Sequence, residues 1–256
     1  MPESNGMYDP QKVVPKAREK IHQTILSWFS KQPRGKILDV PAGFGHLSMR
    51  LKAMGFQVVS GEIEPEIFTL ENMNCVYTDL NTKIDESDNS FDYICCVEGL
   101  EHMTDPYQAV AELARVLKED GYGVFSIPNY SNIEKRFRFF IRGYLTKPKS
   151  IEDYRRAGNS LSNFHNTPLT MTLLNLLFEI NGLKIEKILR DTVKKKQYFW
   201  TPVIAIMKLF AALKSDTAKR KNRYDLTLDN NIILGGNTLI FITKKERKIN
   251  PSRKNA

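Results

Sequence analysis

Residues 36–46, Lys-Ile-Leu-Asp-Val-Pro-Ala-Gly-Phe-Gly-His, decide the fold of this chain. The apolar run around Leu38 is typical of a strand that is buried on both faces. Gly43 and Gly45 then permit a tight turn whose backbone can approach a ligand, and the next helix points its N-terminal amides to the same place. The stretch predicts a strand, a turn and a helix that together form a nucleotide-binding edge.

Acidic residues stand at or just after the ends of four expected strands. They are Asp39, Glu62, Asp79 and Glu98, and the second to fourth strands are expected over residues 56–61, 75–78 and 91–97. Glu62 follows Gly45 by 17 residues, the distance that places a carboxylate at the tip of the neighbouring strand, where it can accept hydrogen bonds from ribose hydroxyls. An alternative is that some of these acids only cap the following helices.

These motifs resemble the class I S-adenosylmethionine (SAM)-dependent methyltransferases. The resemblance covers residues 36 to about 190 and a final strand near 237–243. It is carried by residues 39–45, 61–65, 77–80, 89–102 and 113–129. The family usually has Asp-x-Gly-x-Gly-x-Gly, whereas here Pro41 takes the first glycine position and removes an amide donor from the turn.

The resemblance implies an α/β fold with a Rossmann-like, seven-stranded sheet flanked by helices. The expected organisation is an N-terminal helix in 1–35, a SAM-binding core in 36–190 with a lid insertion at 129–168, a basic and apolar helical insertion in 191–236, and the last strand with a basic tail in 237–256. Within 1–35, residues 11–31 have the spacing of an amphipathic helix. In this family such a helix often lies over the cofactor, and plain packing against the core is an equal alternative.

The resemblance also implies which residues bind SAM. Gly43 and Gly45 would hold its methionine part, Glu62 its ribose, and Asp79 with Leu80 its adenine. The full expected set is Asp39, Ala42, Gly43, Gly45, Glu62, Ile63, Asp79, Leu80 and Glu98.

The segment Glu98-Gly-Leu-Glu101-His102 carries the expected chemistry. If a helix begins at Glu98, the two carboxylates and the imidazole share one face, and such ligands suit Mg²⁺ or Mn²⁺. The pattern is similar to metal-binding segments of ubiquinone-pathway O-methyltransferases and of small-RNA 2′-O-methyltransferases. In the latter a further histidine arrives from downstream, which implies His165 as the fourth ligand.

Two metal-free alternatives stay open for this segment. In one, Glu98 contacts the methionine part of the cofactor, and His102 acts as the general base with Glu101 beside it. In the other, Glu101 and His102 only cap and orient a helix. Because a hydroxyl acceptor needs a base or a metal ion, we expect O-methylation of a small molecule or of a saccharide- or lipid-linked precursor. The rival hypotheses are an RNA 2′-O-methyltransferase and a SAM-binding partner protein without catalysis.

The positive charge of the chain is concentrated in its second half. Residues 1–130 have 12 Lys and Arg against 19 Asp and Glu, residues 131–190 have 11 against 5, and residues 191–256 have 15 against 5. A basic surface favours anionic partners such as phosphosugars, nucleotides, RNA or acidic lipid, although for residues 244–254 a solvated tail is the favoured interpretation. The absence of an RNA-binding motif argues against nucleic acid.

Two further segments combine aromatic and basic residues. The expected lid alternates Arg136, Arg138 and Arg142 with phenylalanines, a pattern that suits a phosphorylated or sugar-like substrate but also a solvated amphipathic helix. Residues 194–221 enclose an apolar stretch between basic flanks, typical of a helix at an anionic membrane surface. The alternative, burial in the core, predicts that Trp200 and Phe210 are buried.

The remaining features concern location. Cys75, Cys95 and Cys96 lack metal-type spacing and are expected to be core thiols of a reducing compartment. No signal segment opens the sequence, and no apolar run reaches the ~18 residues that span a bilayer. We therefore expect a cytoplasmic protein, peripheral to the inner face of the membrane if residues 194–221 bind lipid.

Overall fold

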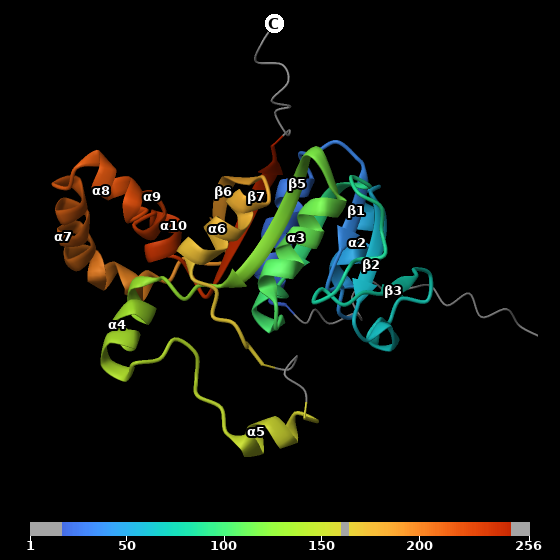
Figure 1. Ribbon diagram of the computed structural model, residues 1–256, viewed down its shortest axis with the longest axis horizontal. Coiled ribbons are helices and arrows are strands. Elements are labelled where there is room, and N and C mark those ends of the chain that lie inside the picture. Colours follow the sequence, from blue (N-terminus) through green and yellow to red (C-terminus); the bar gives the residue numbers. More distant parts are fainter. Residues whose placement is uncertain (1–16, 160–163, 247–256) are drawn as a thin grey trace, which may run out of the picture.

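The computed structural model describes residues 17–159 and 164–246 and contains a seven-stranded sheet (Figure 1). The strand order is β3-β2-β1-β4-β5-β7-β6. The strands are β1 Lys36–Asp39, β2 Gln57–Glu62, β3 Cys75–Tyr77, β4 Phe91–Val97, β5 Leu117–Pro128, β6 Leu183–Arg190 and β7 Thr238–Lys245. The first five are parallel, whereas β7 runs antiparallel to both β5 and β6. The predicted seven-stranded α/β fold is confirmed.

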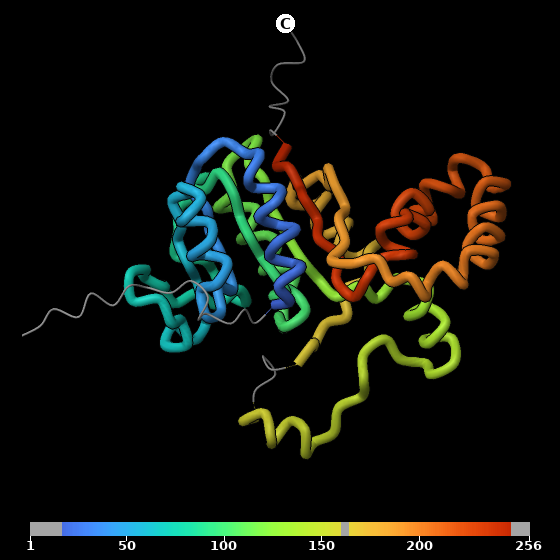
Figure 2. The backbone as a smooth tube through the Cα atoms, turned by 180° about the vertical axis from the view of Figure 1, so that it is seen from behind, coloured from blue at the N-terminus to red at the C-terminus, as the bar shows by residue number. Residues whose placement is uncertain are grey.

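Helices cover both faces of the sheet (Figures 1 and 2). On one face α1 (Glu19–Phe29) and α2 (His46–Ala53) enclose an apolar cluster with Phe29, Leu51 and Tyr93. On the other face α3 (Pro106–Val116) and α6 (Met171–Ile180) enclose a larger cluster. The described helix α1 begins at Glu19, so the part of the expected leading helix before residue 17 lies outside the described residues.

The turn between β1 and α2 needs glycine at both predicted positions. Gly43 and Gly45 have φ angles of 56° and 89°, in the left-handed region that favours glycine. A Cβ atom at Gly45 would lie within 2.8 Å of the side chains of Leu70 and Phe68. Any side chain at this position would therefore displace the loop that follows β2.

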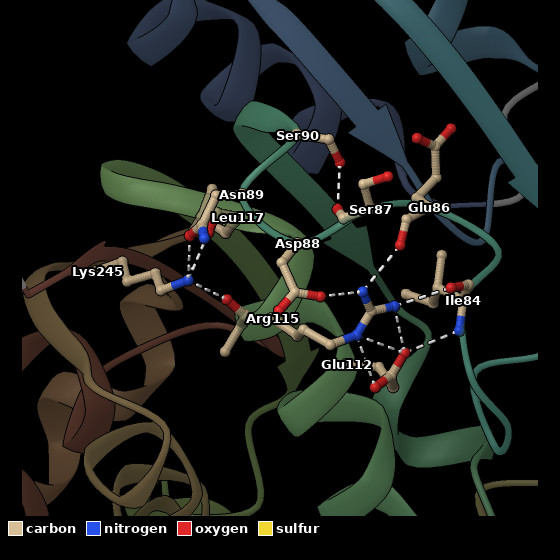
Figure 3. Close-up of polar contacts among 11 residues, drawn as sticks. Ile84, Glu86, Ser87, Asp88, Asn89, Ser90, Glu112, Arg115, Leu117 and Lys245 are labelled. Atoms are coloured by element: carbon tan, nitrogen blue, oxygen red, sulfur yellow. Dashed lines mark hydrogen bonds and ion pairs between the residues drawn. The ribbon is translucent and has the colours of Figure 1, made fainter. Parts of the chain in front are cut away.

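Arg115, near the end of α3, ties that helix to the loop before β4 (Figure 3). Its guanidinium donates to the Glu112 carboxylate at 2.7 Å and to Asp88 at 2.7 Å. It also donates to the carbonyls of Ile84 and Glu86, both at 2.8 Å. The Ile84 carbonyl also accepts from the Glu86 amide at 2.8 Å, so Arg115 adds a second donor there and a charged donor to the Glu86 carbonyl.

Lys245, the last residue of β7, is buried and reaches the far end of α3 (Figure 3). Its Nζ atom donates to the carbonyls of Ala114 and Leu117 at 2.7 and 2.6 Å, and to the side-chain oxygen of Asn89 at 3.0 Å. The ammonium group thus acts as a cap for the end of α3, where a cation is favoured. Of the three cysteines, Cys95 and Cys96 are buried as predicted, whereas Cys75 is half-buried.

Two insertions extend beyond the sheet on the side of β6 and below its carboxyl edge (Figure 1). The first comprises α4 (Ile133–Arg142) and α5 (Ile151–Arg156). The second comprises the short helices η4 (Lys195–Trp200), α7 (Thr201–Ala212), α8 (Asp216–Lys221), α9 (Tyr224–Thr227) and α10 (Asn230–Ile233). Within the described part of the chain, no helix is long and apolar enough to cross a bilayer.

Candidate functional site

A cleft of about 500 Å³ lies at the carboxyl edge of the first four strands. Asp39 and Glu62 are the last residues of β1 and β2, Glu98 directly follows β4, and Asp79 comes two residues after β3. All four acids line the cleft, because the carboxyl ends of parallel strands meet at one edge of the sheet. The other expected cofactor residues at the cleft are Ala42, Gly43, Ile63 and Leu80, while Gly45 shapes the turn beside it.

Asp39 is buried at the base of the cleft. Its carboxylate accepts a hydrogen bond from the Ser48 hydroxyl at 2.6 Å, and Ser60 donates to the same hydroxyl at 2.9 Å. Burial, with a contribution from the nearby Glu62, raises the pKa of Asp39 to about 7. Asp39 therefore fastens the start of α2 to the strands, in addition to facing the cleft.

Glu62 also organises the turn. Its Oε2 atom accepts a hydrogen bond from the Gly43 amide at 2.7 Å, and its Oε1 atom accepts one from the Ile63 amide at 3.0 Å. The Ala42 amide donates to the Gly61 carbonyl at 2.8 Å. The end of β2 thus holds the turn after β1 in place, and each Glu62 oxygen keeps a second lone pair for a ligand.

Asn81 joins two sides of the cleft and was not anticipated from the sequence. Asp79 accepts hydrogen bonds from the Asn81 amide and side chain, both at 2.9 Å. The side-chain oxygen Oδ1 of Asn81 accepts from the amide and the hydroxyl of Thr104 and from the Asp105 amide. The loop after β3 is thereby connected to the loop after β4. These contacts join residues 23 and 24 positions apart in the chain, so the sequence alone does not indicate this role.

Two histidines at the mouth of the cleft were also missed. His22 of α1 and His46 of α2 are joined by a hydrogen bond of 2.8 Å between their Nδ1 atoms. Burial is the main reason that the pKa of His22 falls to about 4, and His46 is the second. His46 lies 3.7 Å from Glu19, which also pairs with Arg50 at 2.6 Å. The leading helix does reach the cofactor cleft, through this histidine contact.

Glu101, His102 and His165 come together at the opposite end of the cleft. Their potential ligand atoms all lie within 4.8 Å of one another, and the centroids of the two imidazole rings are 4.8 Å apart. Glu101 is fully buried, and neither of its carboxylate oxygens has a hydrogen-bond partner among the described residues. Burial, followed by the neighbouring Glu98, raises its pKa to about 8. Such a carboxyl group stays neutral near pH 7 unless a cation joins it.

The side chains of the two residues after His165 hold it in this position through hydrogen bonds to backbone carbonyls. Asn166 donates to the His102 carbonyl at 3.1 Å, and the Thr167 hydroxyl donates to the Met103 carbonyl at 3.1 Å. His165 itself is hydrogen-bonded through Nδ1 to the Tyr130 hydroxyl at 3.2 Å, which fixes the orientation of the ring. The sequence pointed to His165, whereas the three polar residues that hold it are visible only in the structure.

No α-helix begins at Glu98, so the condition for a shared helical face is not met. Glu98 has a φ angle of 52°, and only a single 3₁₀ turn follows, η2 (Leu100–His102). The Glu98 side chain therefore does not share a helical face with the other two residues, and it is not part of their cluster. Burial raises the pKa of Glu98, and Thr238 and Arg18 oppose this rise, so the carboxyl group faces β7 and the α1 side.

The expected arginine and aromatic lid does not line the cleft. Of the described residues between 129 and 168, only His165 does. Arg136 is largely buried and donates to the carbonyls of Ser131 and Thr227, and Arg138 pairs with Glu134 at 2.8 Å. The helix α4 packs on η4 through a ring contact of Phe137 and Trp200. Arg136 and Arg138 thus stabilise the insertion, whereas Arg142 is exposed, and none of the three lines the cleft.

Residues 38–125 match the family model of a methyltransferase domain, which spans β1 to β5 and the whole cofactor edge. These residues form a methyltransferase domain with the class I SAM-dependent fold. A domain of this kind implies SAM as the cofactor. The chain is 26% identical over 157 residues to a ubiquinone biosynthesis O-methyltransferase of Rickettsia akari, covering 57% of this chain and 62% of the relative. It is 30% identical over 136 residues to the enzyme of that name from Aliivibrio fischeri, covering 47% and 56%.

Solved structures have the same fold. A SAM-dependent methyltransferase from Archaeoglobus fulgidus aligns with a TM-score of 0.57 at 18% identity, over 90% of this chain and 95% of the other. One from Aquifex aeolicus aligns with a TM-score of 0.52 at 15% identity, over 93% and 99%. The methyltransferase spans only about three-fifths of the length of the curated relatives that it matches.

Proposed function

We propose that this methyltransferase transfers the methyl group of SAM to a hydroxyl group of a small molecule or of a saccharide- or lipid-linked precursor. The observation that carries the proposal is the cluster of Glu101, His102 and His165 in the cofactor cleft. A hydroxyl group has a high pKa, so its attack on a methyl group needs a base or a metal ion, whereas a thiol or an amine needs less help. The relatives named O-methyltransferases add support.

Methyl transfer from a sulfonium is an in-line displacement. The acceptor oxygen bonds to the methyl carbon while the carbon–sulfur bond breaks, and the hydroxyl proton passes to a base. His102 is the base that we assign, and Glu101 next to it would stabilise the imidazolium that forms. The turn at Gly43 and the carboxylate of Glu62 would hold SAM so that its methyl group faces this cluster.

The same three residues also fit a divalent metal ion. Both oxygens of the buried Glu101 carboxyl group lack partners among the described residues, and two imidazoles lie within reach of it. Because Glu98 is outside the cluster, the donor set is one carboxylate with two imidazoles, which suits Mn²⁺ or another transition metal better than Mg²⁺. A bound ion would orient the acceptor hydroxyls and lower the pKa of the one that attacks.

Methyl transfer from labelled SAM to a panel of phenols, catechols and saccharides, with amines and RNA for comparison, tests the proposal. We expect label on the hydroxyl acceptors. Glu101→Gln should lower kcat by roughly a hundredfold while the affinity for S-adenosylhomocysteine changes little, because Glu101 acts on the transfer step. Glu119→Gln, on the strand β5 far from the cleft, is the matched control. Label on amines alone or on RNA alone would contradict the proposal.

A further inference from the structure

An apolar stripe in contact with water runs from the end of η4 along the outer face of α7. It begins at Phe199 of η4, continues through Val203, Ile206 and Phe210, which follow the spacing of one face of α7, and ends at Leu213, directly after α7. Phe199 is 82% exposed, Phe210 64% and Leu213 75%. We call these five residues the apolar stripe. Burial in the core predicts that Trp200 and Phe210 are buried. Phe210 is exposed, whereas Trp200 is partly buried against the cluster that contains Ile204.

The inner face of α7 already has its own packing partners. Ile204 is buried with Ile133 of α4 and Ile233 of α10, and Ala211 is also buried. Because α7 is apolar on both faces, the inner face accounts for its attachment to the protein and leaves the apolar stripe unexplained. Contiguous exposed apolar surface of this kind marks a site of interaction.

Basic residues flank the apolar stripe in the sequence. Residues 194–221 hold eight Lys and Arg against one acidic residue, Asp216. Lys194 and Lys196 lie 3.4 and 3.5 Å from Glu134, and even with this acid included the region stays strongly positive. Figures 1 and 2 both place α7 and α8 at the end of the molecule opposite to β3. Neither helix contributes a residue to the lining of the cofactor cleft.

We propose that the apolar stripe docks on an anionic membrane surface. Apolar side chains would enter the boundary between headgroups and acyl chains, while the flanking Lys and Arg would contact acidic lipid. Residues 201–212 form a helix too short to span a bilayer, so α7 would lie along the surface. A second copy of this chain is a poorer occupant, because it would bring two basic surfaces together. This inference does not depend on the methyl acceptor.

Co-sedimentation with vesicles tests it. The full chain should sediment with phosphatidylcholine vesicles that contain phosphatidylglycerol, and less so at roughly 0.5 M salt, since salt screens surface charge. Burying a Phe side chain contributes roughly 1.5–3 kcal/mol, so the double variant Phe199→Ser, Phe210→Ser should bind at least tenfold more weakly. Tyr107→Ser, which removes an exposed aromatic residue of α3, is the matched control and should bind normally.

Three results would overturn the inference. One is a wild-type protein that stays in the supernatant at low salt. Another is equal binding to vesicles of phosphatidylcholine alone, which would remove the role given to the basic residues. The third is a dimer in analytical ultracentrifugation that the double variant dissociates, because the stripe would then join two copies. Binding of S-adenosylhomocysteine, which does not use the stripe, reports whether the variants are folded and tests the proposed function separately.

Discussion

The backbone amide of Gly43 and the Oε2 atom of Glu62 are joined by a hydrogen bond of 2.7 Å. The acid at the end of β2 therefore shapes the turn at the end of β1, before any ligand binds. Because Ile63 donates to the other oxygen of the same carboxylate, Glu62 has little freedom to turn away. A residue expected only to bind the cofactor ribose is thus also part of the wall of the cleft.

Replacing Glu62 with Ala should weaken binding of S-adenosylhomocysteine by roughly 1.5–3 kcal/mol or more, because hydrogen bonds to a charged group are lost and the Gly43 amide loses its acceptor. Glu62→Gln, which keeps an acceptor oxygen, should bind with intermediate affinity. Isothermal titration calorimetry measures both. Glu64→Ala, on the exposed loop that follows, is the control, and equal affinity of Glu62→Ala and wild type would refute the assignment.

Titration with Mn²⁺ should show one site, and its affinity should drop at least tenfold in Glu101→Gln and in His165→Asn, since each removes one of three ligands. Glu98→Gln should change Mn²⁺ affinity less, because Glu98 lies outside the cluster. His46→Asn controls for the second group of histidines and should leave the affinity unchanged. If chelator has no effect on activity and no Mn²⁺ binds, His102 acts as a base without metal.

The contribution of His22 to stability should fall as the pH drops from about 6.5 to about 4. The folded-state pKa of His22 is about 4 and its ordinary value is 6.5, so this residue binds more protons in the unfolded chain within this window, and acid favours unfolding at this residue. The shift corresponds to roughly 3 kcal/mol. Asp39 and Glu101, whose pKa values are raised to about 7 and about 8, have the opposite effect, so the comparison is made between wild type and a His22 variant. Urea unfolding at several pH values gives the free energy of unfolding as a function of pH. The difference in this free energy between wild type and His22→Gln should change with pH between about 6.5 and 4, because only the wild type has the titrating imidazole. Above pH 7 the free energy of unfolding of the two proteins should change with pH in the same way. The same pH dependence in both proteins from about pH 4 to about pH 8 would show that His22 does not titrate in this way.

Lys245→Met should lower the free energy of unfolding by roughly 2–4 kcal/mol, because two buried carbonyls lose a charged donor. Lys244→Met is the neighbouring control. Lys244 pairs with Asp120 at 3.4 Å near the surface, and such a pair contributes at most about 1 kcal/mol. Urea denaturation gives both values, and equal losses would mean that the Lys245 contacts do not stabilise the fold.

The sequence predicted the cofactor edge well, because apolar runs indicate buried strands and Gly43 and Gly45 indicate the turn. The conformation of Glu98 escaped prediction because a φ angle of 52° in a residue other than glycine has no signature in composition. Asn81 was missed for another reason. Asn81 accepts hydrogen bonds from Thr104 and Asp105, which lie 23 and 24 residues further along the chain. These bonds form only when β4 lies beside its neighbouring strands.

The position of β7 has a consequence for how the chain is made. Residues 238–245 lie between β5 and β6, although both of those strands precede them in the chain. During synthesis the cofactor half can therefore form first, while β5 keeps an open edge and β6 has no strand to pair with. An open edge of this kind invites association with other chains. A nascent chain halted before residue 238 would be the form most exposed to aggregation and most in need of a chaperone.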